Sequence, residues 1–360
     1  MSEQFCVSVI VPYYNAKSYL RTCLDVLLKQ DFNKSFEIIM IDDGSNDDSR
    51  KIVEECNFPN IRPYALDSNC GPSAARNLGI KKAKGEYVYF FDVDDTIEPN
   101  TLTTLYSVAK EKNYDLVFND KKWIENSKNQ RDNTFYFSTD QTFDNLDFVE
   151  AMRGRFHHPV SADKLFGLTG RLIKRSIISN NNIFFEEKLR YLEDEIFIWD
   201  VLAFVHSAKY VRKQLYSYYV YPNVNTALSE GLSKGYPVSN FKLAKNHIQN
   251  SLKRRGFSDE EINKIGYQGF IFFIISALIS YSRSIAQEKI DLDKGTKCRR
   301  KMIQDILLDS DVSIAIRNYT RSKDESAWIP RAIAWRFPKL LEFACNKRAK
   351  EILKMRKKRI

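Results

Sequence analysis

The chain contains one place where clustered carboxylates directly follow a strongly apolar run. Residues 87–91, read as YVYFF, are followed at once by Asp92, Asp94 and Asp95. Like charges at the end of a buried strand are electrostatically unfavourable unless a cation or a basic ligand lies among them. The spacing therefore predicts a divalent-cation site, which taken alone would suit either phosphoryl transfer or sugar transfer.

Polar residues also follow two earlier apolar runs. Cys6 to Val11 is followed by PYYN at residues 12–15, and Phe36 to Ile41 by DDGS at residues 42–45. Asp and Gly favour turns, and Asp or Ser caps helices, so the second motif alone is also explained as an ordinary turn. Three strand ends that carry phenols and carboxylates are much harder to explain in that way, and we expect them to form one site.

A second acidic group lies far along the chain. Glu193, Asp194 and Glu195 fall in the first turn of a helix that we expect to begin near Leu192. Carboxylates in a first turn are favoured by the helix dipole whether or not they take part in chemistry. The residues alone therefore do not choose among these three carboxylates.

Residues 6–120 alternate between strand-like runs and segments with helical spacing, such as Ser18 to Lys29 and Pro72 to Lys82. This alternation predicts an α/β fold with a mostly parallel sheet and helices on both faces, in which ligands bind beyond the carboxyl ends of the strands. The expected strands are Cys6 to Val11, Phe36 to Ile41, Ile61 to Ala65, Tyr87 to Phe91 and Asp115 to Phe118.

The rest of the chain divides less clearly. From about Asn119 to Val160 the pattern predicts irregular structure, and order returns over residues 161–205. Lys209 to Tyr221 has the character of an aromatic strand, and the polar loop after it is a plausible lid over a substrate. Helical spacing follows near residues 236–254, 259–286, 297–319 and 327–358. We expect a domain over residues 1–232, with a nucleotide-binding half (1–120) and an acceptor-side half (121–232), and a helical domain over 233–360.

The positive charge of the chain is concentrated at its C-terminal end. Residues 331–360 hold eleven Lys and Arg against two Glu, so this segment carries +9 of the net charge of +10. A basic helix with aromatic residues suits an anionic membrane surface, but cations also favour helix C-termini without any partner. Both alternatives stay open. Nucleic acid is not an expected partner, because the basic residues are confined to one terminus.

Cysteine usage and hydropathy favour a cytoplasmic protein. The six cysteines are far apart and form no CxxC pair, which argues against a disulfide framework. We expect no signal peptide, because Cys6 already begins a strand-like run. The most apolar stretch, Ile265 to Ser282, falls short of the roughly 20 residues that span a bilayer, so we expect a buried core helix there. Any membrane contact is expected to be peripheral, at the inner face of the cytoplasmic membrane.

Four segments in register resemble the successive signatures of family 2 glycosyltransferases with the GT-A fold. They read VSVIVPYYN, IIMIDDGSNDDS, GPSAARNLGI and GEYVYFFDVDDTIEP, and the later LEDE is similar to the acidic pair that carries the catalytic base in that family. The resemblance is strong over residues 6–120, moderate over 161–230 and absent from the C-terminal third. It implies an inverting enzyme that uses a nucleotide sugar, usually UDP-linked, and a divalent Mn or Mg ion.

The resemblance also implies roles for individual residues. Asp194 would be the general base, with Glu193 as second choice, and Asp94 would lie closest to the metal, with Asp92 and Asp95 as further candidates. A metal and an arginine stabilise the charge that a departing nucleotide diphosphate gains, and a carboxylate on the opposite face accepts the proton of the attacking hydroxyl. The residues expected to bind the donor are Pro12, Tyr14, Asn15, Asp43, Arg76, Asp92 and Val93.

The expected reaction moves a hexose or an N-acetylhexosamine from a UDP-sugar to a hydroxyl of a glycan or lipid-linked acceptor. Synthesis of a bacterial cell-surface polysaccharide, such as a capsule or lipopolysaccharide, is the expected setting. One departure concerns Tyr218 to Ser229, where relatives often place an Arg or His that contacts the diphosphate or the metal. This chain has neither residue there, which leaves the third metal ligand open.

Two other functions remain as alternatives. The run FDVDDT also fits the DxDxT motif of haloacid dehalogenase-type phosphatases, in which the first Asp, here Asp92, is a phosphorylated nucleophile and the second, here Asp94, an acid or base. That motif normally begins its domain, whereas three strand-and-motif units precede it here. A non-catalytic glycan-binding protein that kept the GT-A sheet is the second alternative.

Overall fold

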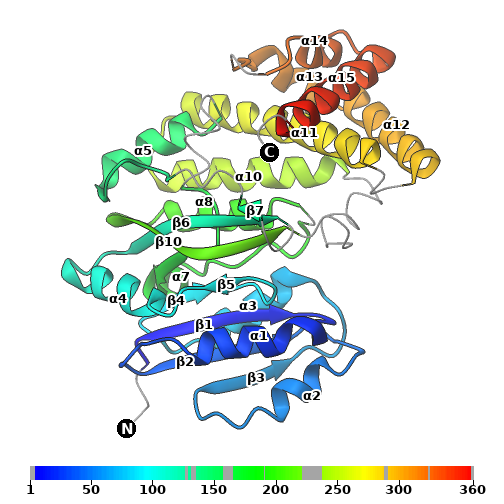
Figure 1. The fold of residues 1–360 in the computed structure, drawn as a ribbon. Coiled ribbons are helices and arrows are strands. Elements are labelled where there is room, and N and C mark those ends of the chain that lie inside the picture. Colours follow the sequence, from blue (N-terminus) through cyan, green and yellow to red (C-terminus); the bar gives the residue numbers. More distant parts are fainter. Residues whose placement is uncertain are drawn as a thin grey trace. The chain divides into compact units, whose positions relative to one another are not determined.

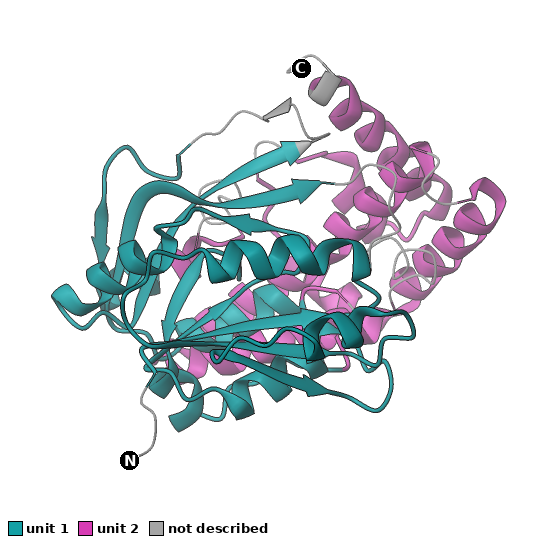
Figure 2. Ribbon diagram, turned by 60° about the horizontal axis from the view of Figure 1, so that its bottom comes forward, with its two compact units in different colours: residues 1–150, 166–187, 193–222 teal, residues 151–165, 188–192, 223–360 magenta. Residues whose placement is uncertain are grey.

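The computed structural model describes residues 5–125, 129–130, 135–156, 165–189, 191–220, 237–287, 291–322 and 325–357 (Figure 1). The chain forms two compact units that alternate along the sequence (Figure 2). Unit 1 comprises residues 1–150, 166–187 and 193–222, and unit 2 comprises residues 151–165, 188–192 and 223–360. The expected domain boundary near residue 232 and the expected lid over 222–233 lie outside the described residues and stay predictions.

Unit 1 is built on one sheet whose N-terminal part is parallel. β1 (Val7–Tyr13) pairs in parallel with β2 (Phe36–Asp42) on one side and with β4 (Tyr87–Phe90) on the other. β2 in turn pairs in parallel with β3 (Ile61–Ala65). The three motif segments that contain strands therefore lie side by side, as the alternation of strand and helix predicts.

Beyond β4 the sheet is mixed. β9 (Arg171–Lys174) lies antiparallel between β4 and β6 (Leu116–Glu125), and β6 is parallel to β10 (Ala208–Val220). The described strands follow the order β3-β2-β1-β4-β9-β6-β10-β5. The short strands are antiparallel to their partners: β5 (Thr96–Ile97) and β8 (Gln141–Phe143) on β10, and β7 (Asn129–Gln130) on β6.

Helices cover both faces of the parallel strands because β1 is apolar on both faces. Val9 belongs to the same buried cluster as the apolar face of α1 (Lys17–Leu28). Ile10, which points to the opposite face, meets α3 (Pro72–Lys82). A Cβ atom at Gly79 of α3 would lie only 2.5 Å from Ile10 Cγ2, so the helix approaches the sheet as closely as it does only with glycine there. Burial on both faces is typical of parallel strands.

The four strands and two helices whose bounds were expected before residue 95 agree with the structure to within two residues at each end, but the expectation of irregular structure over residues 119–160 is wrong for the residues described there. β6 continues to Glu125, and α5 (Asn145–Gly154) follows β8. Asp144 begins that helix, since its Oδ1 accepts hydrogen bonds from the backbone nitrogens of Leu146 and Asp147. The polar residues that suggested irregular structure therefore include a helix cap. The other helices of unit 1 are α2 (Ser49–Glu54), α4 (Thr101–Glu111), α7 (Arg175–Asn180) and α8 (Glu193–Leu202).

Apart from a few linking residues, the described part of unit 2 is helical. α10 (Val238–Arg254) packs on α11 (Asp259–Ala286), which begins with a capping box formed by Ser258 and Glu261. By length and composition alone α11 could cross a membrane, but 67% of its apolar stretch is buried inside the protein. A core helix of a globular unit has the same properties, so the helix is weak evidence for a membrane span.

The C-terminal helices are shorter than their spacing suggests. The expected segment 297–319 begins earlier and is divided at Asp309, whose carboxylate accepts bonds from the backbone nitrogens of Asp311 and Val312. The expected segment 327–358 is broken at Arg336, where the backbone has a φ of 51°. The resulting elements are α12 (Leu292–Leu308), α13 (Ser310–Ala315), the 3-10 helix η1 (Ile316–Asn318), α14 (Trp328–Ala334) and α15 (Pro338–Lys357).

Candidate functional site

The carboxyl ends of β1, β2 and β4 lie at one edge of the parallel strands. Tyr13 is in register with Asp42, and Ile10 with Phe90. The polar residues that follow each strand therefore begin at the same edge, where open α/β sheets bind their ligands. The structure thus brings residues 12–15, 42–45 and 92–95 to one side of unit 1.

The turns after β1 and β2 are joined to each other. The backbone nitrogen of Asn15 donates to Ser45 Oγ at 2.9 Å, and that of Asn46 donates to Asn15 Oδ1 at 2.9 Å. Asn15 has a φ of 47°, which asparagine tolerates better than most residues. Pro12 is buried within β1, whereas Tyr14 is 44% exposed and presents its ring to solvent.

Asp43 fixes the start of α3. Its two carboxylate oxygens accept hydrogen bonds from the backbone nitrogens of Cys70 and Gly71, at 2.8 and 2.9 Å. Gly71 directly precedes α3 and has a φ of 94°, a conformation that only glycine adopts without strain. The carboxylate at the end of β2 therefore orients the helix that carries Arg76.

Arg76 joins the two acidic groups that the sequence singles out. Its Nη2 donates to Asp92 Oδ1 at 3.0 Å, and its Nη1 donates to Asp194 Oδ1 at 3.1 Å. The Arg76 side chain is only 7% exposed. Burial opposes its charge, but the carboxylates of Asp194 and Asp92 more than offset this and raise the pKa of Arg76. One guanidinium thus connects residues that are 118 and 16 positions away in the sequence.

Aromatic rings support this guanidinium. The Arg76 guanidinium carbon lies 5.4 Å from the centroid of the Phe185 ring, and Phe185 is stacked on Phe197 at 4.0 Å. Phe90 packs edge-on against both rings. Because Phe90 ends β4 and Phe197 belongs to α8, this cluster also holds the strand before Asp92 and the helix of Asp194 together. Cation–π attraction adds to the ion pairs.

The three carboxylates after β4 have different environments. Asp95 is buried and accepts hydrogen bonds from the Tyr216 hydroxyl at 2.5 Å and from the Tyr219 backbone nitrogen at 3.0 Å. Burial and the neighbouring charges of Asp92 and Asp94 raise the pKa of Asp95 to about 8. Burial and the charge of Asp92 raise the pKa of Asp94 to about 6. The negative charge at this turn is therefore incompletely compensated within unit 1.

Asp94 and Asp92 fit a divalent cation by their chemistry. Carboxylate oxygens are the ligands that Mg²⁺ and Mn²⁺ prefer. Burial is the main cause of the raised pKa of Asp94, and a cation would relieve the repulsion from Asp92 that adds to it. Among the described residues no group of three or more His, Cys, Asp or Glu side chains is placed to hold a metal. A Mg²⁺ site that also binds substrate phosphates nevertheless usually has only one or two carboxylate ligands from the protein.

Glu193 and Asp194 open α8 on the other side of Arg76. Burial and the adjacent charge of Asp194 raise the pKa of Glu193 to about 7. Burial raises the pKa of Asp194 as well, against the opposing effect of Arg76. A carboxylate with a raised pKa is better matched to accepting a proton near neutral pH. Leu192, immediately before them, has a φ of 73°, which is strained for this residue type.

Three further side chains contribute to the site and are absent from the sequence predictions. Lys121 of β6 interacts electrostatically with Asp95, Asp92 and Asp194, and burial lowers its pKa to about 8. Tyr216 of β10 holds Asp95. Asn77, next to Arg76, donates to Phe185 O and Glu187 Oε1, both at 2.9 Å, and accepts from the Phe185 backbone nitrogen at 2.8 Å. The motif GPSAARNLGI contains Asn77, so only that residue had a signal in the sequence.

Comparison with known proteins finds relatives in sequence. Residues 8–156 match the family model of glycosyl transferase family 2. Glycosyltransferase GlyG of Streptococcus pneumoniae is 33% identical over 224 residues, which cover 61% of this chain and 71% of GlyG. The poly(ribitol-phosphate) beta-N-acetylglucosaminyltransferase TarS of Staphylococcus aureus is 32% identical over 193 residues, which cover 53% of this chain but only 31% of TarS. The chain thus spans about a third of the length of that relative.

The fold also has solved counterparts. The crystal structure of residues 1–349 of S. aureus TarS with UDP superposes with a TM-score of 0.67 over 96% of this chain and 92% of that one, at 20% identity. The same protein with UDP-GlcNAc gives a TM-score of 0.66 over 98% of this chain. At this identity the likeness shows the fold alone. The expected GT-A architecture followed by a helical C-terminal region is confirmed.

Proposed function

Because the chain belongs to glycosyltransferase family 2, we propose that it is an inverting glycosyltransferase that moves a hexose or N-acetylhexosamine from a UDP-sugar to an acceptor hydroxyl. The observation that carries the proposal is the contact of one buried guanidinium, Arg76, with carboxylates of two distant segments, Asp92 and Asp194. Membership of this family makes the phosphatase alternative untenable, because Asp92 and Asp94 follow three strand-and-motif units of a glycosyltransferase sheet.

The leaving-group side of the proposed reaction is formed by Arg76 and the carboxylates after β4. Asp94 and Asp92 would hold a Mn or Mg ion, with Asp95 as second choice, and the bound ion would neutralise charge on the departing diphosphate. Arg76 contacts Asp92 and contributes a positive charge that is already in place, so it needs no reorganisation during the reaction. In the donor complex, the Arg76 guanidinium would contact the diphosphate as well as Asp92 and Asp194. Lys121 adds a second cation nearby.

Nucleotide binding is proposed for the turns at the same edge of the sheet. Tyr14 is exposed beside Asn15 and is available to stack on a base. Asp43 acts on the site by orienting α3, although its oxygens already accept two backbone hydrogen bonds. Pro12 and Val93 would add backbone and apolar contacts to the donor.

Asp194 is the proposed general base. It opens α8 opposite the carboxylates after β4, and its side chain is 40% exposed, so an acceptor hydroxyl can reach it. Deprotonation of that hydroxyl during attack on the anomeric carbon would place the proton on Asp194, while the diphosphate leaves on the other side. Glu193 is the second choice for the same role.

The acceptor side follows from the relatives. TarS is named for transfer of N-acetylglucosamine to poly(ribitol phosphate). A relative from Bacillus spizizenii, 30% identical over 264 residues, is named for glucosyl transfer to the same polymer. We therefore propose that the acceptor is a cell-surface polysaccharide. UDP-GlcNAc and UDP-glucose are the first donors to test. A capsule or lipopolysaccharide glycan and a lipid-linked intermediate fit the same proposal.

Titration of the purified chain with UDP, with and without Mn, tests the donor site directly. Metal-dependent binding is expected for an enzyme, whereas a glycan-binding scaffold would show none. Thermal stabilisation by a panel of nucleotide sugars then identifies the donor, and release of UDP in the presence of that donor measures turnover. Binding of no nucleotide under any condition would refute the proposed function.

A cytoplasmic location with peripheral contact to the membrane is proposed for the basic end of α15. Lys347, Lys350 and Lys354 are exposed there, and each Lys near an anionic surface contributes about 1 kcal/mol to binding. Replacing all three by Gln should reduce sedimentation with anionic liposomes. Substitution is preferable to deletion, because Ala349 of the same helix is fully buried. Equal sedimentation of the variant and the parent would leave the basic end as a solvated helix terminus.

A further inference from the structure

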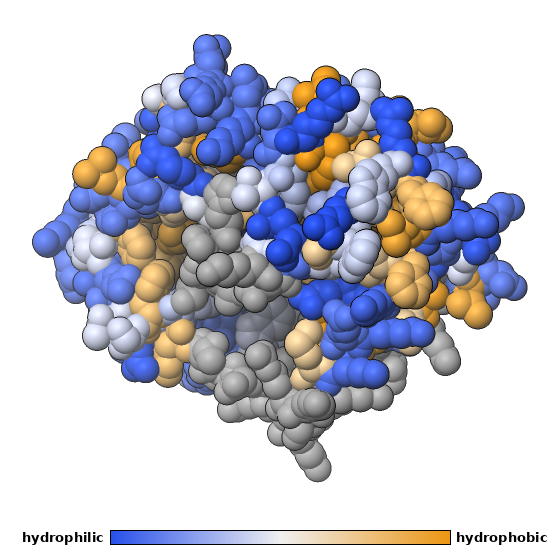
Figure 3. All heavy atoms as spheres, turned by 90° about the horizontal axis from the view of Figure 1, so that it is seen from above, coloured by the Kyte–Doolittle hydropathy of each residue, from blue (hydrophilic) through white to orange (hydrophobic). Residues whose placement is uncertain are grey.

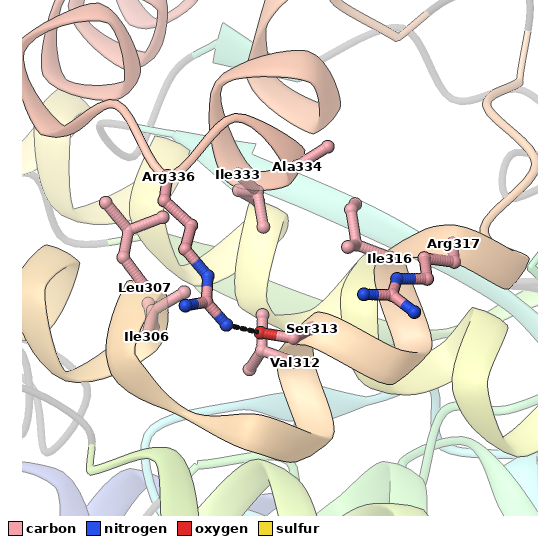
Figure 4. Close-up of a pocket in the computed structure, with 9 residues that line it drawn as sticks. All are labelled: Ile306, Leu307, Val312, Ser313, Ile316, Arg317, Ile333, Ala334 and Arg336. Carbon is pink, nitrogen blue, oxygen red and sulfur yellow. Dashed lines mark hydrogen bonds between the residues drawn. The ribbon is translucent and has the colours of Figure 1, made fainter.

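A cavity of about 270 Å³ lies within unit 2, and its lining residues are separate from the site of unit 1 (Figure 4). Its wall is formed by apolar side chains of α12, α13, η1 and α14, among them Leu307, Val312 and Ile333. Two arginines, Arg317 and Arg336, also line it. Pockets for drug-sized ligands occupy about 300–1,000 Å³, so this cavity suits a small charged group with a short apolar segment.

Among the described residues, the two guanidiniums of the cavity have no acidic partner. Arg336 Nη2 donates to Ser313 Oγ at 2.6 Å, and within the part of the chain that the structure describes neither arginine forms an ion pair. Elsewhere in unit 2 the pattern differs, since Arg299 contacts Glu342 at 2.7 Å and Arg153 contacts Glu261 at 2.9 Å. The cavity therefore presents positive charge that no carboxylate in the described segments neutralises.

Arg336 occupies a backbone position that favours glycine. Its nitrogen donates to Ile333 O at 3.0 Å and the Phe337 nitrogen donates to Ala332 O at 3.0 Å, which is the hydrogen-bond pattern of a Schellman motif ending α14. The residue at this point has a φ of 51°, and a side chain there costs about 1 kcal/mol relative to glycine. The strained residue places its guanidinium at the cavity (Figure 4). Such strain is a reason to look for a function.

Exposed apolar side chains flank this arginine. Trp335 is 63% exposed and Phe337 52%, and Leu308 at the end of α12 is 80% exposed. Seen from above Figure 1, groups of hydrophobic residues lie among strongly hydrophilic ones (Figure 3). Large exposed apolar side chains next to unpaired cations are typical of a surface that meets a partner with an anionic and an apolar part.

We propose that this cavity binds the phosphate group of an anionic amphiphile. Arg317 and Arg336 would hold the phosphate oxygens, for which the planar guanidinium is well shaped, and the apolar wall would cover the first methylenes of the chain. Trp335 and Phe337 would contact the chain beyond the cavity. The site is independent of sugar transfer, since it uses none of the residues proposed for the donor or the base.

Calorimetric titration of the whole chain with octyl phosphate, inorganic phosphate and octanol tests the chemistry. Octyl phosphate should bind at least about tenfold more tightly than either fragment, because only it engages both the guanidiniums and the apolar wall. Flotation with phosphatidylcholine vesicles, with and without phosphatidic acid, separates a membrane lipid from a free amphiphile when it is done on the chain with Lys347, Lys350 and Lys354 replaced by Gln, with and without Arg336→Gly. Binding of inorganic phosphate as tight as that of octyl phosphate would overturn the proposal, as would no binding of octyl phosphate.

Two variants and one control assign the binding to the cavity. Arg336→Gly and Arg317→Gln should each weaken octyl phosphate binding at least about tenfold, and glycine at position 336 should keep α14 and its Schellman motif intact. Arg331→Gln makes the same change of charge on α14 at a residue that packs on Trp328 and does not line the cavity. Unchanged binding in both cavity variants, or an equal loss in Arg331→Gln, would contradict the assignment.

Discussion

Arginine is used in opposite ways at the sheet edge of unit 1 and at the cavity of unit 2. Arg76 is buried, lies on an aromatic ring and contacts two carboxylates. Arg317 and Arg336 are exposed and have no acidic partner among the described residues. A charge that the protein neutralises itself is held in one position, as reaction chemistry requires. A charge left unpaired at an apolar cavity can instead be neutralised by a ligand from outside.

The largest effect is expected from removing the buried guanidinium. Arg76→Met leaves Asp92 and Asp194 without their common partner and should lower the free energy of unfolding by about 3 kcal/mol. This value lies at the lower end of the roughly 3–5 kcal/mol for breaking a buried pair, because Asp194 is partly exposed. Urea denaturation measures it.

Arg336→Gly is the matched comparison for that experiment. It also deletes one guanidinium, but from the position where glycine is favoured, so stability should stay constant or rise by up to about 1 kcal/mol. Equal losses in Arg76→Met and Arg336→Gly would remove the distinction between the two regions.

The second effect concerns turnover at the sheet edge. Asp194→Asn keeps an oxygen that can accept the bond from Arg76 but removes the proton acceptor, so donor affinity should stay nearly constant while turnover falls at least about a hundredfold. Release of UDP and calorimetric titration with the donor measure the two quantities. Glu111→Gln removes an exposed carboxylate of α4 and serves as the control for the change of charge.

Glu193→Gln decides between the two candidate bases. Its turnover should fall less than that of Asp194→Asn, because Glu193 is proposed only as a neighbour of the base. The reverse order would assign the base to Glu193, and a large loss of donor binding in Asp194→Asn would place the base outside this pair.

The fold of residues 6–111 is predictable from sequence because local periodicity and long-range topology agree there. Pro72 to Lys82 is a helix in both the expectation and the structure, since proline at its first position and glycine before it define the start. The edge position of residues 92–95 also follows, because parallel strands end at one side of a sheet. Family membership could be read from the same segments.

Contacts between distant segments were not predictable. Arg76 was expected at the diphosphate, but nothing local indicates that it also meets Asp194. Two register shifts in the pairing of β10 with β6 precede Tyr216. Because such shifts interrupt the alternation of side chains along β10, the sequence does not reveal on which face of the sheet Tyr216 lies. Pro338 indicates a helix break nearby, because proline seldom lies inside a helix. The position of the break was not predictable, because Arg336 stands where a helix end usually has glycine.

The third prediction tests how far the sheet edge depends on its supports. Asn77→Ala removes two hydrogen bonds to the backbone of Phe185 and one to Glu187 Oε1, and it leaves the buried Phe185 nitrogen without its acceptor. Stability should fall by about 2 kcal/mol. Turnover should fall as well, because Phe185 lies under Arg76. Thermal unfolding and UDP release, measured on the same preparation, check both effects, and a loss of stability with full turnover would show that Phe185 does not position Arg76.

The last effect, and the smallest when taken per pH unit, is a dependence of stability on pH. It should come from the carboxylates of the sheet edge, since the cavity is lined by none. In the folded chain the pKa of Glu193 rises from 4.5 to about 7, so between these values the folded chain retains a proton that the unfolded chain releases. Rising pH therefore favours unfolding in this window, by at most about 1.4 kcal/mol per pH unit, and has no further effect through Glu193 above it. Glu193→Gln should reduce the slope of unfolding free energy against pH between about 4.5 and 7, whereas Glu111→Gln should not. The same slope in Glu193→Gln and the parent chain would show that protonation of Glu193 is not coupled to folding. The contrast between the sheet edge and the cavity would then rest on their arginines alone.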